Sequence, residues 1–189
     1  MIKLFFDTEF TGLHQNTTLI SLGIISEDNK TFYAEFNDYD ATQVNDWIQK
    51  HVIDNLKFYY NNDTNLIFDD MNNNVSVYGN SQFIRDQLIN WLNQFDTVEC
   101  WSDCLAFDWV LFCNLLSNDG TALTLPENIY YIPFDICTLF KVAKIDPDIN
   151  REEFAEIEDD SISEKHNSLW DAFIIKKCFD KLSNFVSID

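Results

Sequence analysis

The chain has 189 residues, 46% of them hydrophobic and 15% aromatic, enough to fill one sizeable core, so we expect a single domain over residues 1–189. Its 12 basic side chains against 32 acidic ones give a formal net charge of −20, which disfavours binding of nucleic acid over a wide surface by electrostatic attraction. That charge still leaves room for a local site at which cations bind phosphate.

We expect neither a membrane span nor a secretion signal. The sequence has no apolar run near the roughly 18 residues that a spanning helix needs, and its first residues lead directly into a strand pattern. The five cysteines are odd in number and contain no C-x-x-C pair, which suits reduced thiols. These features predict a soluble, cytoplasmic protein without membrane attachment.

The first third of the chain predicts an antiparallel meander followed by a helix. Residues 2–6, 18–26 and 31–36 are apolar or alternating, as strands are, and a turn signal separates the second from the third. Over residues 43–56, apolar positions recur with the spacing of an amphipathic helix.

The rest of the chain alternates between helices and strands. Residues 57–79 are rich in Asn and have no period, so we expect an irregular segment with a short strand near 75–78. The elements expected after it are a helix over 81–95, a strand over 98–102, a helix over 104–117, a strand over 129–134, a helix after Asp135 and a helix over 169–183. This order predicts an α/β fold with a mixed five-stranded sheet, helices on both faces and the first strand in the middle.

Two carboxylates stand at the end of the first strand, in the stretch LFFDTE. Side chains two apart on a strand point to the same side, so Asp7 and Glu9 can converge on one small volume. Two anions held that close need a counter-charge. A strand that simply runs into a turn shows the same triplet, and Gly12 supports a turn in either case.

A second signal is Asp108, the sole charged residue in the stretch CLAFDWVLFCNLL. Its helical neighbours are apolar, namely Cys104, Leu105, Leu111, Phe112 and Leu115. A structural explanation is a carboxylate stabilised by the dipole of a helix N-terminus. A functional explanation is a cation partner.

The third signal is the stretch EKHNSLWDA, residues 164–172. Ser168 and Asp171 fit a capping box at the start of the last helix. His166 comes just before it among polar neighbours, which makes it a poor core residue. A mobile imidazole beside a helix-anchored carboxylate is typical of a general base near a metal.

In this order the three signals resemble the DEDDh 3′–5′ exonucleases of the ribonuclease H-like fold, over nearly the whole chain. The stretches FFDTEFTG, LISLGIIS, WSDCLAFDWVLF and HNSLWDA are most similar to the small polyadenylate-specific exoribonucleases of the RNase AS type, more than to ribonuclease T, oligoribonuclease or proofreading domains. The resemblance implies a homodimeric two-metal hydrolase with Asp7, Glu9, Asp108 and Asp171 as metal ligands and His166 as general base. The Asn-rich middle segment and the extreme acidity depart from the family pattern.

Four carboxylates can hold two Mg²⁺ or Mn²⁺ ions, one to activate the attacking water and one to steady the leaving 3′ oxygen. The expected reaction is hydrolysis of single-stranded RNA from its 3′ end to nucleoside 5′-monophosphates. A preference for poly(A) or other A-rich ends rests on the resemblance alone. Phe10 and Leu13, in the turn after Glu9, are candidates to pack against terminal bases.

Other polar side chains are expected outside this site. Asp103 and Asp135 are predicted N-caps of the helices that follow them, His14 should lie in an exposed turn, and His51 on a helix surface. The acidic run over 156–164 is predicted to be a solvated loop. Cys and His show no zinc-ligand spacing, and the sequence has no Gly-rich phosphate loop.

Two alternatives stay open. A DNA 3′–5′ exonuclease, a proofreading subunit or a nuclease of short oligonucleotides would use the same site, because a metal-bound phosphate does not distinguish ribose from deoxyribose. A non-catalytic nucleotide-binding module of the same fold would be favoured by loss of a site residue, and none of the five is missing.

Overall fold

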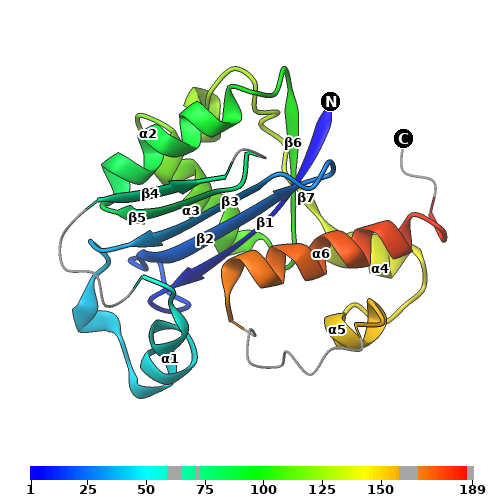
Figure 1. Cartoon of the computed structure of the whole chain (residues 1–189). Helices are drawn as coiled ribbons and strands as arrows, with labels where there is room; N and C mark the ends of the chain where they lie inside the picture. Colours follow the sequence, from blue (N-terminus) through cyan, green and yellow to red (C-terminus); the bar gives the residue numbers. More distant parts are fainter. Residues whose placement is uncertain (59–64, 71–72, 158–165, 187–189) are drawn as a thin grey trace.

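The computed structural model of the chain describes residues 1–58, 65–70, 73–157 and 166–186. Its centre is a seven-stranded mixed sheet with the strand order β4-β5-β3-β2-β1-β6-β7 (Figure 1). The strands are β1 (Ile2–Phe10), β2 (Leu19–Ser26), β3 (Thr31–Phe36), β4 (Leu66–Asp69), β5 (Val75–Gly79), β6 (Val98–Ser102) and β7 (Phe134–Asp135). The predicted α/β class and mixed sheet are confirmed.

The helices follow the third, fifth, sixth and seventh strands along the chain. The α-helices are α1 (Asp46–His51), α2 (Ser81–Leu92), α3 (Ala106–Leu116), α4 (Ile136–Val142), α5 (Arg151–Phe154) and α6 (Ser168–Leu182). Short 3₁₀ helices are η1 (Ala41–Gln43), η2 (Ile53–Asn55) and η3 (Ala122–Thr124). Among these described helices none is both long and apolar enough to cross a membrane.

Strand β1 lies in the interior of the sheet, as its apolar sequence predicts. It pairs antiparallel with β2 and parallel with β6. Successive side chains on a strand point to opposite faces, so Leu4 and Phe6 enter the core on one face while Phe5 enters the core on the other. Both faces are therefore covered.

Helices cover the two faces in separate groups. One core contains residues of α2 and α3 together with Leu4 and Phe6, and the other contains residues of α4, α5 and α6 together with Phe5. Figure 1 shows α6 crossing its face of the sheet, with its first turn near the C-terminal end of β1. The expectation of helices on both faces is confirmed.

The sheet has seven strands where the sequence predicted five. Strand β5 pairs parallel with β3, and β4 pairs antiparallel with β5, so a hairpin extends the sheet inside the segment expected to be irregular. The short strand expected near 75–78 is β5. Strand β4 was not predicted, because a strand is recognised by a run of apolar or β-branched residues and many Asn residues surround this short one.

Two other element boundaries differ from the prediction. The single helix expected over 43–56 is broken into η1, α1 and η2, since Asn45 caps α1 by accepting a hydrogen bond from the Ile48 amide at 2.9 Å. The strand expected over 129–134 is reduced to β7, preceded by one isolated bridge between Ile129 and Val98.

Candidate active site

A cavity of about 540 Å³ opens at the C-terminal end of β1. Walls for it come from β1, α1, α3 and the start of α6, which are distant in sequence (Figure 1). Its lining includes every site residue predicted from the sequence, namely Asp7, Glu9, Phe10, Leu13, Asp108, His166 and Asp171. The structure therefore brings together residues that the sequence separates by more than half its length.

Strand β1 supplies the first two carboxylates. Asp7 and Glu9 are half-buried and point to the same side of the strand, as their spacing predicts. In the register of the sheet, Asp7 lies opposite Gly23 and Glu9 opposite Ser21, both on β2. This register places both carboxylates beside the part of β2 on which α6 packs.

Asp108 lies in the first turn of α3 and is buried, with 6% of its surface exposed. Its Oδ1 accepts a hydrogen bond from the Thr8 amide at 2.9 Å and another from the Thr8 hydroxyl at 2.6 Å. Two donors on one oxygen fix the orientation of the carboxylate. Asp108 lines the cavity in this fixed orientation.

The first turn of α6 rests directly on β2. A Cβ atom at Gly23 would lie 2.2 Å from the Leu169 amide nitrogen and 2.3 Å from the Ser168 carbonyl, so only glycine permits this approach. The buried hydroxyls of Ser21 and Ser168 are hydrogen-bonded at 2.9 Å across the contact. Asp171, one turn into α6, is thereby carried to the cavity.

The capping box predicted for α6 is wrong in its first residue. The N-cap is Asn167, whose side-chain oxygen accepts a hydrogen bond from the Trp170 amide, because the Ser168 hydroxyl is engaged with Ser21 inside the contact. The Asn167 side-chain amide donates to the Tyr33 hydroxyl at 3.3 Å. The residue next to His166 is thus tied to strand β3.

His166 precedes this cap in a left-handed backbone conformation, with φ of 65°. Its ring meets the ring of Trp47 edge to face, with centroids 5.0 Å apart. Trp47 also stacks on His51 at 4.7 Å, and the two histidine rings are 6.2 Å apart. Helix α1 therefore contacts the predicted general base.

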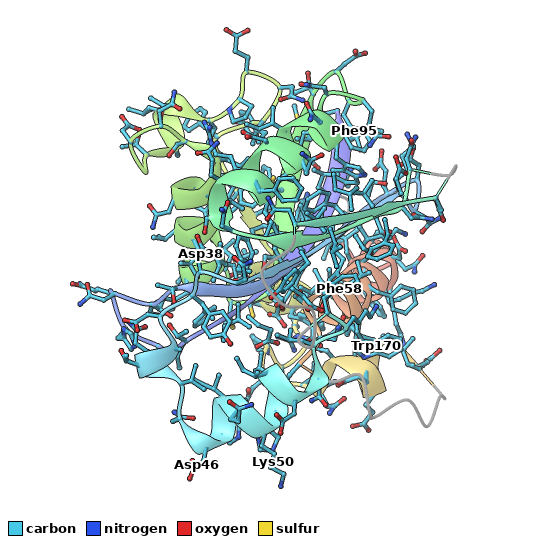
Figure 2. All side chains as sticks on the ribbon, turned by 60° about the vertical axis from the view of Figure 1, so that its left-hand side comes forward. Asp38, Asp46, Lys50, Phe58, Phe95 and Trp170 are labelled. Carbon is cyan, nitrogen blue, oxygen red and sulfur yellow. The ribbon has the colours of Figure 1, made fainter. Side chains whose placement is uncertain are left out.

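Sequence reasoning missed this contact. His51 was predicted to be a surface residue, but it is half-buried against Trp47, on which it stacks. Ile48 and Val52 pack in one cluster with Ile20 and, like Trp47, line the cavity. Figure 2 shows the side chains of Asp46 and Lys50 on the outer side of α1. The amphipathic spacing alone could have identified the helix, but no local signal says that it covers an active site.

Electrostatics in the cavity favour a bound cation. Burial raises the pKa of Asp7 well above its ordinary value, and the charges of Asp108, Asp171 and Glu9 raise it further. Burial likewise raises the pKa of Glu9, with Asp171 and Asp108 contributing. Burial also raises the pKa of Asp108. Carboxylates that repel one another at such short range gain stability from a divalent cation.

Ligand atoms of Glu9, His166 and Asp171 all lie within 4.8 Å of one another, close enough to share one ion. Asp7 and Asp108 line the same cavity, and their charges raise the pKa values of the group. Carboxylate oxygens dominate this donor set, which suits a hard cation. Acidic groups of this site could therefore bind a metal.

The two apolar candidates lie at the mouth of the cavity. Phe10 is half-buried and stacks on Phe107 with ring centroids 5.6 Å apart, whereas Leu13 is 80% exposed. His14 is exposed in the turn, as predicted. Phe107 was not singled out from the sequence, since an aromatic residue in an apolar helix gives no sign of facing substrate.

Of the two predicted N-caps, one is confirmed. Asp135 caps α4 by accepting from the Cys137 amide at 2.7 Å. Asp103 is not a cap, because its carboxylate accepts two hydrogen bonds from Arg151, at 2.6 and 3.0 Å, and Leu105 occupies the N-cap position of α3. The acidic run predicted as a solvated loop falls mostly outside the described residues.

The strand order and the helices on both faces of the sheet define an α/β fold of the ribonuclease H-like class. The crystal structure of the RNase domain of the yeast Pop2 protein has the same fold, with a TM-score of 0.59 and 16% identity over 97% of this chain and 76% of that chain. The family model described as the 3′–5′ exoribonuclease Rv2179c-like domain matches residues 2–183. The chain belongs to this family of 3′–5′ exoribonucleases.

Two curated relatives come from strains of Mycobacterium tuberculosis. They are the 3′–5′ exoribonuclease Rv2179c of strain ATCC 25618 / H37Rv and the 3′–5′ exoribonuclease MT2234.1 of strain CDC 1551 / Oshkosh. Each is 27% identical over 130 residues, which span 68% of this chain and 67% of the relative. The exoribonuclease family inferred from the sequence motifs is thereby confirmed.

Proposed function

We propose that this protein is a metal-dependent 3′–5′ exoribonuclease that hydrolyses single-stranded RNA to nucleoside 5′-monophosphates. The observation that carries the proposal is the convergence of four carboxylates and a histidine, Asp7, Glu9, Asp108, Asp171 and His166, on one cavity. Membership of the exoribonuclease family supports the same conclusion.

The oxygen-rich donor set and the raised carboxyl pKa values fit two Mg²⁺ or Mn²⁺ ions held by Asp7, Glu9, Asp108 and Asp171. Bound ions of this kind neutralise charge on the scissile phosphate and lower the pKa of the attacking water. Thr8 orients Asp108 through its two hydrogen bonds, so that this carboxylate reaches its ligand position without rearrangement.

His166 accepts the proton of the attacking water in this proposal. The contact with Trp47 and the anchored neighbour Asn167 hold the imidazole at the cavity wall. Because Glu9, His166 and Asp171 could also share an ion, the base and ligand roles need a separate test. The variant His166→Ala should lose turnover but keep Mn²⁺ binding measured by calorimetry, and a loss of both would make His166 a ligand.

The substrate is proposed to bind through its last few nucleotides. With a net charge of −20 the protein surface repels the rest of a polyanion, while Phe10 and Leu13 at the cavity mouth can pack on terminal bases. Stacking of this kind contributes about 1–3 kcal/mol per base and does not select among bases. A preference for A-rich ends, a homodimeric assembly and a cytoplasmic location are therefore proposed on the resemblance to RNase AS enzymes and on composition.

Digestion of matched poly(A), poly(U) and poly(C) substrates tests the substrate claims, with a 5′-labelled DNA of the same length alongside. We expect nucleoside 5′-monophosphates as products, poly(A) degraded fastest and DNA degraded slowest. Equal rates on the three RNA homopolymers would remove the adenine preference and leave a general exoribonuclease. Faster cleavage of DNA would replace the proposal by a DNA exonuclease, and cleavage of circular RNA would exclude an exonuclease.

A further inference from the structure

Cys104 and Cys137 lie at the ends of two neighbouring parallel strands. Ser102 of β6 pairs with Asp135 of β7, and each cysteine follows its paired residue by two positions. Their Sγ atoms are 3.5 Å apart. Although 33 residues separate the two cysteines in sequence, the sheet register therefore makes them a close pair of thiols.

Access to this pair is through Cys104. Its side chain is exposed and lines both the active-site cavity and an adjoining cavity of about 410 Å³. Cys137 is half-buried beneath it. The remaining cysteines, Cys100, Cys113 and Cys178, are buried in the core. A small reagent that enters the active site therefore meets the Cys104 thiol first.

Polar groups surround the inner thiol. Cys137 donates a hydrogen bond to Asp103 at 3.0 Å, and the Arg151 guanidinium lies 3.4 Å from its sulfur. Arg151 is itself held by Asp103 and by the carbonyls of Pro147 and Ile149, at 2.7 and 2.6 Å. Ligand atoms of Asp103, Cys104 and Cys137 lie within 4.8 Å of one another, but both carboxylate oxygens of Asp103 are already hydrogen-bonded to Arg151, which favours thiol chemistry over a metal ion at this pair.

We propose that Cys104 and Cys137 form a modification site at which a peroxide oxidant creates an intramolecular disulfide, and that the disulfide lowers nuclease activity. In the first step Cys104 attacks the peroxide, the O–O bond breaks, and the sulfur becomes a sulfenic acid while water leaves. In the second step the Cys137 sulfur attacks the Cys104 sulfur. The S–O bond breaks, and the hydroxyl leaves as water with the proton of the Cys137 thiol.

The geometry permits the bond with a small movement. The Sγ–Sγ separation has to close from 3.5 Å to a bonded length of about 2.05 Å, a movement of about 1.5 Å. Cys104 already has a left-handed backbone, with φ of 51°, in the turn between β6 and α3.

That movement affects the active site because the same turn leads into Asp108. Oxidation removes the hydrogen bond from Cys137 to Asp103 and pulls the turn before α3 toward α4. Asp108 follows Cys104 by four residues and supplies part of the cavity wall. Displacement of a catalytic group by an ångström costs about 100-fold in rate, so we expect oxidation to lower activity by about 10- to 100-fold. This part of the inference rests on the proposed function.

The test treats the reduced, chelator-washed protein with hydrogen peroxide and then counts free thiols by reaction with a chromogenic disulfide. Peptide mapping under non-reducing conditions identifies the linked pair. We expect two thiols to be lost, a mass decrease of about 2 Da, a Cys104–Cys137 peptide, and recovery of thiols and of RNA degradation with dithiothreitol. The variant Cys137→Ser keeps a donor toward Asp103 and basal activity but forms no disulfide, whereas the control Cys113→Ser is oxidised like the natural chain.

Two results would overturn the inference. One is retention of all five thiols, or a disulfide between other cysteines, under conditions that oxidise Cys104 to a sulfenic acid in Cys137→Ser. The other is an oxidised protein that contains the Cys104–Cys137 peptide but degrades RNA at the reduced rate. The thiol measurement does not depend on nuclease activity, so a failure of the proposed function would leave it standing.

Discussion

Thr8 donates two hydrogen bonds to one oxygen of Asp108, from its amide at 2.9 Å and from its hydroxyl at 2.6 Å, across 100 residues of sequence. The contact joins the central strand of the sheet to the first turn of α3. Glu9 and Asp7 flank Thr8 on the same strand, so one short segment positions three of the four carboxylates of the proposed metal site.

Replacement of Thr8 by Val should weaken metal binding without unfolding the protein. The hydroxyl hydrogen bond lowers the pKa of Asp108 against the raising effect of burial, so its loss makes the carboxylate hold its proton more tightly. Loss of such a supporting contact typically costs about 10- to 100-fold in metal affinity. Calorimetric titration with Mn²⁺ measures the change. Thr8→Ser retains the hydroxyl and should bind as the natural chain does, and equal affinities for the two variants would contradict this role.

Replacement of Gly23 by Ala should damage both stability and activity. The new Cβ would meet backbone atoms of Ser168 and Leu169, which cannot rotate away, so α6 must move outward and carry Asp171 with it. Overpacking of this kind costs about 1–3 kcal/mol, measured as the free energy of unfolding in urea. The matched control is Gly79→Ala, where the new Cβ meets side chains of Asn65 and Phe83 instead. If Gly23→Ala lost less free energy of unfolding than Gly79→Ala, the contact between α6 and β2 would be able to accommodate the added methyl group.

Stability without metal should depend on pH in a defined direction. Because burial and mutual repulsion raise the pKa values of Asp7, Glu9 and Asp108, the folded protein holds protons that the unfolded chain has lost above about pH 4. Above about pH 4, the contribution of these three carboxyl groups to the free energy of unfolding therefore falls as the pH rises through their raised pKa values.

Thermal unfolding in EDTA, at about pH 5 to 7, measures this contribution. The quantity compared is the melting temperature of the natural chain and of Asp7→Asn. We expect the variant to melt higher at the upper end and the difference to shrink as pH falls. Added Mg²⁺ should reverse the order at the upper end, since the cation stabilises only the intact cluster. A natural chain that melts above Asp7→Asn in EDTA would mean that Asp7 stabilises the fold by other contacts.

Trp47 should act as a positioning residue for His166. Edge-to-face aromatic contacts contribute about 0.5–1.5 kcal/mol, so Trp47→Ala should lower kcat by about 2- to 12-fold and the melting temperature by no more than about 6 °C. Trp47→Phe keeps a ring and should restore most of the rate. Asp46→Ala changes the outward face of the same helix (Figure 2) and serves as the control. An unchanged pH profile and kcat in Trp47→Ala would show that His166 needs no such support.

The sequence predicts the ligand-bearing strand and helices well because their signals are local. Asp7 and Glu9 follow an apolar strand, and Asp108 interrupts an apolar helix, so each carboxylate is visible within a few residues. The α/β class follows from the same local patterns. Strand β4 was missed, since its pairing with β5 is decided by the sheet edge rather than by its own residues.

Contacts between elements could not be predicted in this way. The approach of α6 to Gly23, the contact of Trp47 with His166 and the pairing of Asp103 with Arg151 join segments that are distant in sequence. Asn167 replaces Ser168 as the cap for the same reason, because the serine hydroxyl is used in a tertiary contact. Local sequence patterns identify candidate residues of a site, but the packing of the elements determines which residues these side chains contact.

We propose above all that Asp7, Glu9, Asp108 and Asp171 would hold the divalent cations on which hydrolysis of RNA from its 3′ end depends. The most direct measurement is a time course of 5′-labelled single-stranded RNA on a sequencing gel, in Mg²⁺, in Mn²⁺ and in EDTA, with the natural chain and the four single alanine variants. We expect a ladder that shortens from the 3′ end in either cation, no shortening in EDTA, and none with any of the variants. Shortening at the natural rate in EDTA, or by a folded carboxylate variant, would contradict the account.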